Sequence, residues 1–305
     1  MTTRDAYETS GRYLQMMGGL DSVAARVRAR LLVDHLVGVR YAHLMQPARQ
    51  LGPDDEARLR LALRDVARGY PLPYLVQECE FFGLSFHCDE RALIPRPETE
   101  TLVEAALERL KNRSHPFVAD LGTGTGCIAV SIAHTLPDAT VYATDVQRDT
   151  LDLARENAIR HDVAGRIHFI PGDVDDWAAP LLRATSIKFD AVFSNPPYIP
   201  REEIARLQPE IRDWEPRPAL DGGPDGLDCY RRIATQSGAL LKPDGFLMVE
   251  LGAGQDEAVR AIFTAAGWPV EPPLFDLAGI ARVLPATISH GITRKDTECS
   301  VAPSF

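Results

Sequence analysis

The sequence lacks any apolar run that is long enough to cross a membrane. A transmembrane helix needs about 18 or more consecutive apolar residues, and no segment approaches that length. The first five residues are mostly polar, without the hydrophobic core of a secretory signal. We therefore expect a cytoplasmic protein with no membrane partner.

Cysteine and histidine are too few and too scattered to suggest a disulfide framework or a metal centre. The five cysteines are odd in number and include no CxxC pair, and the eight histidines include no HExxH motif. A zinc site or a redox-active dithiol would need spacings of that kind. The sequence therefore predicts reduced thiols and no bound metal.

Basic residues are fewer than acidic residues. The 33 Lys and Arg residues are outnumbered by 43 Asp and Glu residues, which gives a formal net charge of −10. Such a charge argues against a surface that coats nucleic acid, so we expect no stable nucleic-acid partner. Residues 1–75 differ, with 11 arginines and 8 acidic side chains. That slightly basic part would suit an acidic partner, but a solvated helical surface explains it as well.

The hydrophobic pattern divides the chain into a helical part and an alternating part. A length of 305 residues is enough for about two domains. Residues 1–75 show helical spacing without alternation, which predicts a small all-α domain. Residues 76–95 predict a linker that contains a β-hairpin, and residues 286–305 predict a polar, frayed tail.

Strands and helices alternate across residues 96–285, the predicted catalytic domain. The predicted strands are 117–121, 140–144, 166–170, 189–193, 245–251, 269–276 and 280–285. The predicted helices between them are 127–135, 150–161, 228–241 and 255–266. Regular βαβ alternation predicts an α/β fold with a doubly wound, mostly parallel sheet.

A glycine-rich loop follows the first of these strands. Its GxGxG spacing differs from the GxGxxG of dinucleotide-binding folds. Asp120 precedes the glycines, and a carboxylate there disfavours an anionic pyrophosphate but suits a ligand with an ammonium group and a positive sulfur. We predict that the loop binds the cofactor through Gly122, Thr123, Gly124, Thr125 and Gly126.

Acidic residues follow the next two predicted strands. Asp145 ends the second strand, where a carboxylate can accept from both ribose hydroxyls of an adenosine. Asp173 and Val174 follow the third strand, where an aspartate could accept from the adenine amine. Either aspartate alone is as readily a solvated loop residue. Behind the glycine loop, however, the set predicts S-adenosylmethionine as the cofactor.

Asn195-Pro196-Pro197-Tyr198 follows the 189–193 strand, at the edge of the sheet where α/β proteins bind ligands. The prolines fix φ and carry no N–H, so the turn is rigid and its carbonyls have few local donors. With the Asn195 amide and the Tyr198 ring, it can hold a planar NH2 group. A proline turn without chemistry is the alternative for an isolated NPPY. We predict Asn195, Pro196 and Tyr198 as catalytic, Pro197 as substrate-binding with them, and Asn195 as also near the cofactor.

The run Ile94-Pro95-Arg96-Pro97-Glu98-Thr99-Glu100 precedes the first strand of the sheet. Pro97 suits the first position of a helix, and the two glutamates suit its positive end. Arg96 is predicted to face the substrate from the roof of the cleft. Helix capping explains Glu98 and Glu100 equally well.

These motifs together resemble class I S-adenosylmethionine-dependent methyltransferases that act on planar nitrogen. The closer resemblance is to the HemK/PrmC family, the protein-(glutamine-N5) methyltransferases of peptide chain release factors, and it covers most of residues 1–285. It is carried by Phe81-Phe82-Gly83, the IPRPETE run, Asp120 to Gly126, Asp145, NPPY, Glu215-Pro216, Asp221-Gly222-Gly223 and Asp225-Gly226-Leu227.

The resemblance implies a fold, a substrate and roles for these residues. It implies a class I methyltransferase domain behind a helical substrate-recognition domain, and a release factor as the protein partner. The target would be the glutamine of the GGQ motif, bound by NPPY, while the glycine loop and Asp145 would bind the cofactor. Val174 stands where relatives often place a larger residue against the adenine.

Other activities share some of these features. A sister group methylates a glutamine of a ribosomal protein and has NPPY, but it usually departs from the PETE run. A methyltransferase that acts on the exocyclic amine of a nucleic-acid base also uses NPPY, but it would need a positively charged recognition region. The missing GxGxxG glycine disfavours a nicotinamide-dependent oxidoreductase, and the intact motifs disfavour a non-catalytic scaffold.

Overall fold

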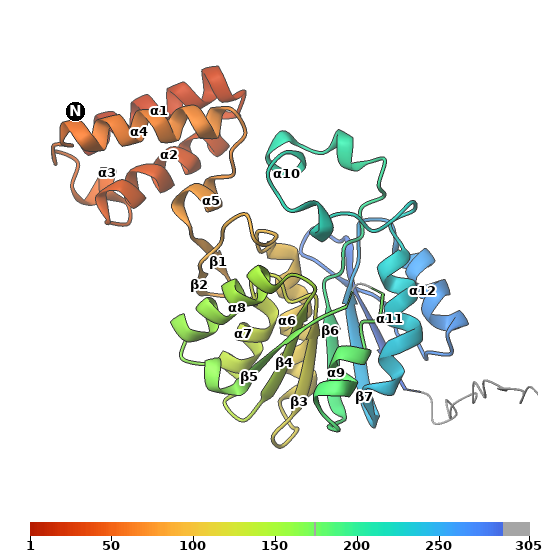
Figure 1. Ribbon diagram of the computed structural model, residues 1–305. Helices are drawn as coiled ribbons and strands as arrows, with labels where there is room; N and C mark the ends of the chain where they lie inside the picture. The colour runs from red at the N-terminus through yellow and green to blue at the C-terminus, as the bar shows by residue number, and fades with distance from the viewer. Residues whose placement is uncertain (174, 289–305) are drawn as a thin grey trace, which may run out of the picture.

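The computed structural model describes residues 1–173 and 175–288. Figure 1 shows a helical lobe at the N-terminus, joined through a β-hairpin to a sheet that is covered by helices on both faces. The helices of the lobe are α1 (Thr3–Gly18), α2 (Ser22–Val37), α3 (Ala42–Met45), α4 (Pro53–Ala67) and α5 (Leu72–Val76). Their apolar faces form a separate core that includes Leu14, Leu32 and Leu59.

Local capping explains where the long helices of the lobe begin. The side chain of Thr2 accepts from the backbone N–H of Asp5, and the Asp5 carboxylate accepts from that of Thr2. Asp21 accepts from the first turn of α2 in the same way. Each such cap contributes about 1 kcal/mol to helix stability.

The hairpin β1 (Cys79–Phe81) and β2 (Leu84–Phe86) is antiparallel, as the linker pattern predicts. A 3-10 turn, η1 (Pro97–Thr99), and α6 (Glu100–Leu110) follow, so Pro97 does open a helical segment. The buried rings of Phe81 and Phe86 pack with α6 and with the helices of the first face of the sheet. The hairpin is therefore anchored to the domain that follows it.

The sheet has seven strands in the order β5-β4-β3-β6-β7-β9-β8. Its strands are β3 (Phe117–Leu121), β4 (Thr140–Asp145), β5 (Ile167–Pro171), β6 (Phe189–Ser194), β7 (Leu241–Glu250), β8 (Leu274–Phe275) and β9 (Ala281–Thr287). The pairings from β5 through β7 are parallel, and those of β9 with β7 and β8 are antiparallel. The predicted doubly wound, mostly parallel sheet is confirmed.

Two layers of helices cover the sheet. Together with α6, α7 (Cys127–Thr135) and α8 (Arg148–Arg160) form a core with one face of the sheet. The other face is covered by α9 (Ala179–Ala184), α11 (Asp228–Gln236) and α12 (Asp256–Ala265). The long connection between β6 and α11 contains η3 (Ile204–Arg206), α10 (Pro209–Arg212) and η4 (Arg217–Ala219).

Some predicted boundaries were wrong. The helix predicted for 228–241 ends at Gln236, and β7 begins at Leu241 because that residue already pairs with Phe189. The strand predicted for 269–276 is reduced to β8. The predicted end of the domain at residue 285 was early, since β9 continues to Thr287, which pairs with Phe246. Residues 289–305 of the predicted tail lie outside the described residues.

The topology brings the two main motifs together. From β3 the chain winds through β4 to β5, and it then returns to place β6 on the other side of β3. Ligands bind in open α/β sheets at such a switch point, outside the carboxyl ends of the strands. Leu121 of β3 pairs with Ser194 of β6. The glycine loop and NPPY therefore start from adjacent strand ends.

Candidate active site

A cleft of about 420 Å³ lies at this switch point. Its walls come from the segment 91–96, the glycine loop, the ends of β4 and β5, NPPY and the connection that follows β6. The volume is in the range of small-molecule and cofactor sites. Among the described residues, no group of three or more His, Cys, Asp or Glu side chains is placed to hold a metal ion. In the same part of the chain, no helix is long and apolar enough to span a bilayer.

The glycine loop is folded back onto the end of β4. The backbone N–H groups of Gly122 and Thr123 both donate to the carbonyl of Thr144, at 2.9 and 2.8 Å. Gly126 opens α7 at φ +82°, and a Cβ there would lie 3.1 Å from the Cβ of Ala154 on α8. Only glycine allows this turn to pack so closely against α8. All five loop residues that were predicted to bind the cofactor belong to this segment, and four of them, from Gly122 through Thr125, line the cleft.

Asp145 lines the cleft at the end of β4. One carboxylate oxygen accepts from the N–H of Gly124 at 3.1 Å, and the other accepts from the N–H of Gln147 at 3.1 Å. Burial raises the pKa of this carboxyl, against the lowering effect of those two bonds. Each oxygen keeps a further lone pair, so the carboxylate can also accept from a pair of neighbouring hydroxyls. This is the chemistry that the ribose of an adenosine needs.

Asp120 lies beneath the loop rather than in it. Its side chain is fully buried, and burial raises its pKa to about 7, opposed by the hydroxyl of Thr123, which donates to one carboxylate oxygen at 2.6 Å. Trp177 packs against the loop, where its ring stands 3.5 Å from the position of a Cβ on Gly122. Trp177 and Asp173 both line the cleft, whereas Val174 lies outside the described residues.

Asn195 lines the cleft and is held by its side-chain nitrogen. Its Nδ2 donates to the hydroxyl oxygen of Thr99 at 3.1 Å. No described residue donates to its Oδ1. The amide is therefore fixed on one side, and its strongest acceptor is available to a ligand.

The rest of NPPY is braced by the residue before α12 and by the connection that follows β6. The Tyr198 carbonyl accepts from Gln255 Nε2 at 2.9 Å. A Cβ on Gly226, at φ +77°, would lie 2.4 Å from that carbonyl oxygen, so the two backbone segments touch. Pro197 lines the cleft, whereas Pro196 and Tyr198 are not among the described residues that do. Burial raises the pKa of Tyr198 to about 12, so its phenol stays protonated at neutral pH.

Arg96 lines the cleft but already has a partner. Its guanidinium pairs with Glu215, whose side chain is 2% exposed. Glu215 also accepts from the N–H of Ile94 at 3.3 Å. Burial raises the pKa of Glu215, and the neighbouring Arg96 opposes that rise. Arg96 therefore ties the roof of the cleft to the segment after α10, and its predicted role toward the substrate stays a prediction.

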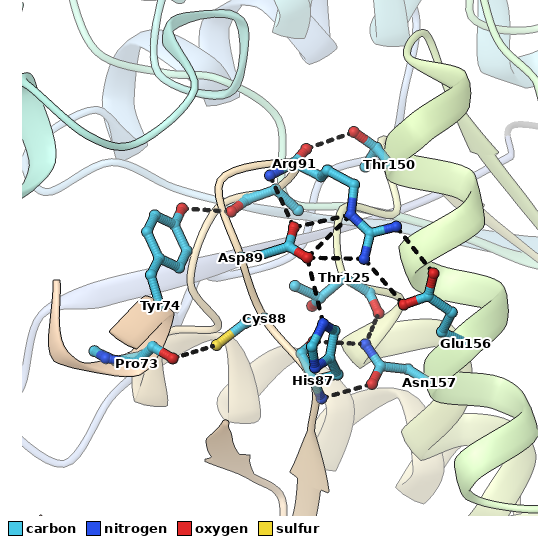
Figure 2. Close-up of polar contacts among 11 residues, drawn as sticks. Pro73, Tyr74, His87, Cys88, Asp89, Arg91, Thr125, Thr150, Glu156 and Asn157 are labelled. Carbon is cyan, nitrogen blue, oxygen red and sulfur yellow. Dashed lines mark hydrogen bonds and ion pairs between the residues drawn. The ribbon is translucent and has the colours of Figure 1, made fainter. Parts of the chain in front are cut away.

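The segment between the hairpin and the roof of the cleft is bound to the glycine loop through Asn157, as Figure 2 shows. The buried Asn157 amide accepts from the N–H of His87 at 2.7 Å and donates to the carbonyls of His87 and Thr125, each at 2.9 Å. Nearby, Arg91 forms ion pairs with Asp89 and Glu156. The segment that leads into residues 91–96 of the cleft wall is thus coupled to the cofactor loop.

Replacing Asn157 with alanine should weaken both the fold and cofactor binding. Three hydrogen bonds of about 0.5–1.5 kcal/mol each are lost, and the Thr125 carbonyl loses its donor in a buried position. We expect the free energy of unfolding to fall by about 2–4 kcal/mol and the Kd for S-adenosylmethionine to rise. Denaturant unfolding and titration calorimetry measure the two effects. Asn112→Ala, at an exposed position, is the control, and equal values for both variants would contradict the proposed coupling.

Comparison with known proteins shows the family to which this chain belongs. The Methyltransferase small domain family matches residues 99–207. A protein of Moorella thermoacetica named "Release factor glutamine methyltransferase" is 41% identical over 285 residues, which is 92% of this chain and 96% of that protein. A protein of the same name from Bradyrhizobium diazoefficiens is 38% identical, over 86% of this chain and 88% of that protein. The chain belongs to the release factor glutamine methyltransferase family.

Solved structures agree with the fold. The crystal structure of the hMettl16 catalytic domain in complex with MAT2A 3′UTR hairpin 1 superposes with a TM-score of 0.55 at 16% identity, over 81% of this chain and 84% of that chain. As a release factor glutamine methyltransferase family member, the chain is an S-adenosylmethionine-dependent methyltransferase. The glycine loop, the acceptor pair of Asp145 and the absence of a basic side chain from residues 120–126 fit that cofactor.

The family's motifs and the cleft coincide only in part. The structure brings residues 122–125, Asp145 and Asp173 together with Asn195 and Pro197 around one cavity. Thr99, Trp177 and Asn157 were not predicted as site residues. Thr99 lies within the PETE run that carries the family resemblance, and this was the single indication in the sequence that it belongs to the site. Nothing local marked the other two.

Proposed function

We propose that this enzyme transfers a methyl group from S-adenosylmethionine to the side-chain amide nitrogen of a glutamine, in the GGQ motif of a peptide chain release factor. The observation that supports this most is the Asn195 amide, which is held through its nitrogen and has its oxygen free at the cleft. Such an acceptor suits an NH2 group. Bound S-adenosylmethionine would supply the electrophilic methyl group.

The chain's own residues would position and activate the nitrogen. An amide nitrogen is a poor nucleophile because its lone pair is delocalised into the carbonyl. Asn195 Oδ1 and the Pro196 carbonyl would each accept one hydrogen of the glutamine NH2, which fixes its direction and favours a pyramidal nitrogen. Orientation of this kind can supply several of the roughly 7–11 kcal/mol that positioning makes available. The same oxygens stabilise the positive charge that develops on nitrogen.

Tyr198 would act through its ring rather than its hydroxyl. The pKa of Tyr198 is raised, which makes it a poor general base. An aromatic face near a cationic centre contributes about 0.5–2 kcal/mol. A dedicated base is unnecessary because a protonated, methylated amide is strongly acidic and loses its proton after transfer.

The helical lobe would recognise the protein substrate, in a cytoplasmic setting. Arg28 of α2 makes a bidentate ion pair with Glu210 of α10, with Arg28 Nη2 and Glu210 Oε2 2.9 Å apart. The rings of Tyr70 and Trp214 pack edge to face, with their centroids 4.8 Å apart. The lobe therefore touches the same connection that braces NPPY, and a substrate bound to the lobe would lie beside the cleft.

Mass spectrometry of a purified release factor tests the proposal. After incubation with enzyme and S-adenosylmethionine, we expect a gain of one CH2 on the GGQ glutamine. A release factor with that glutamine replaced by alanine is the control. Parallel incubations with ribosomal protein and with RNA or DNA test the alternatives. Methylation of one of those and not of the release factor would overturn the assignment.

A further inference from the structure

The helical lobe holds the connection between β6 and α11 at its outer end. Figure 1 shows α10, which belongs to this connection, beyond the sheet and on the side of the lobe. Arg28 of α2 and Glu210 of α10 form a bidentate ion pair, which fixes direction as well as distance. Their side chains are only 23% and 27% exposed, so solvent and salt screen the pair in part. The ring of Trp214, in the same segment, packs against Tyr70.

The same segment joins two parts of the cleft wall through Glu215. Its buried carboxylate accepts from the N–H of Ile94 at 3.3 Å and pairs with the guanidinium of Arg96. Ile94 and Arg96 line the cleft, and so does Pro216, the next residue after Glu215 in the chain. One carboxylate therefore ties the segment 91–96 to the connection that the lobe holds.

Beyond Glu215, the connection pairs with the residue that follows NPPY. The N–H of Ile199 donates to the carbonyl of Leu220 at 3.0 Å, and the N–H of Gly222 donates to the carbonyl of Ile199 at 2.9 Å. Two prolines and the turn η4 lie between Glu215 and Leu220, and each proline fixes its own φ. This short, stiff segment carries a shift of α10 to both the segment 91–96 and NPPY.

We propose that Arg28 and Glu210 are positioning residues, which hold the connection so that the cleft wall and NPPY keep the geometry needed for methyl transfer. The lobe then supports the chemical step as well as the docking of the substrate. Neither residue touches the reacting atoms, and both act through residues 213–223. The inference rests on the function proposed above and adds this role of the lobe to it.

A positioning role and a docking role differ in their kinetics. A contact that only docks the release factor is the same before and during transfer, so its loss raises KM and leaves kcat unchanged. A contact that positions the cleft acts on the bound complex. Its loss lowers kcat even when the release factor is saturating, because the reacting groups are then less well aligned.

An exchange of the two charges tests the proposal. In Arg28→Glu, two carboxylates face each other between α2 and α10, and we expect kcat at saturating release factor to fall by about three- to thirtyfold. Glu210→Arg should lower kcat in the same way. The double variant, Arg28→Glu with Glu210→Arg, restores an ion pair and should recover most of the rate. Arg26→Glu makes the same change at an exposed position of α2 and should keep the wild-type kcat.

Amide hydrogen exchange tests the coupling without any substrate. The N–H groups of Ile94, Ile199 and Gly222 are held by the contacts described above. In Arg28→Glu we expect them to exchange at least about threefold faster, because the segment that holds them opens more often. The double variant should return to the wild-type rates. The amides of β3 serve as the control for global unfolding, and their exchange should not change in any variant.

The outcomes separate this inference from the proposed function. A raised KM with unchanged kcat in Arg28→Glu would make the ion pair a docking contact only. Unchanged exchange at the three amides would mean that the connection keeps its place without the lobe, and a double variant that stays slow would mean that the charges do not act as a pair. Each of these results overturns the inference alone. A wild type that methylates no release factor overturns the proposed function, whereas the exchange rates still decide whether the lobe holds the cleft wall.

Discussion

Replacing Asn195 with alanine should reduce kcat by about 10²–10³-fold while S-adenosylmethionine still binds. The effect of removing one preorganised group that stabilises developing charge has this size. The Asn195 amide contributes its free Oδ1 to the cleft and is anchored by Thr99. Alanine removes the acceptor that orients the nucleophile. The cofactor's main contacts, by contrast, would come from the glycine loop and Asp145, which stay in place.

Two measurements separate catalysis from binding in Asn195→Ala. Single-turnover methylation of the release factor gives the rate of transfer, and titration calorimetry gives the Kd for S-adenosylmethionine. Asn112→Ala makes the same chemical change at an exposed position after α6 and should match wild type in both. If Asn195→Ala lost cofactor binding as well as turnover, its role would be structural support of the cleft. The assignment as the acceptor for the substrate would then be wrong.

The fold was predictable because its determinants are local. Apolar runs that end in a glycine loop, an aspartate or a proline turn marked β3, β4 and β6, and their order along the chain implied parallel pairing. The start of β7 was missed for a local reason too. Residues 241–244 include a proline and an Asp that indicate a turn, yet Leu241 pairs with Phe189 across an irregularity in the register.

Site residues could be predicted only where a sequence motif itself indicated their chemical role. Asp145 and Asn195 could be named from their positions after strands, because the carboxyl ends of parallel strands share one edge. The contact of Asn195 with Thr99 spans 96 positions in the sequence. No spacing rule reaches that far, and a threonine in the first turn of a helix has an ordinary explanation.

The roles of NPPY are also clearer in three dimensions than in the sequence. Asn195 and Pro197 line the cleft, and Tyr198 is held by Gln255 and lies against Gly226. A rigid turn was predicted from the prolines alone. The structure adds that the connection after β6 fixes the turn from behind. That connection also contacts the helical lobe, so substrate docking and the geometry of the acceptor share one segment.

Replacing Asp145 with alanine should weaken S-adenosylmethionine binding by at least about 100-fold. A hydrogen bond to a charged group contributes about 1.5–3 kcal/mol, and a carboxylate that holds two ribose hydroxyls makes two of them. The two backbone N–H groups that Asp145 accepts from would also lose their partner, which loosens the glycine loop at Gly124. Asp138→Ala, at an exposed position before β4, is the matched control and should bind normally.

The pH dependence of cofactor binding gives Asp145 a second test. Burial raises its pKa, so the carboxylate becomes protonated at a higher pH than an ordinary aspartate does. A protonated carboxyl is a poorer acceptor, and affinity should therefore decline as the pH falls through that raised pKa. Calorimetry across the acid range would show that the affinity for S-adenosylmethionine declines with pH in the wild type. In Asp145→Ala, the affinity would not change in this way. Equal affinity of the wild type and Asp145→Ala at neutral pH would mean that the ribose is held elsewhere. The acceptor pair at the end of β4 would then serve only to shape the loop.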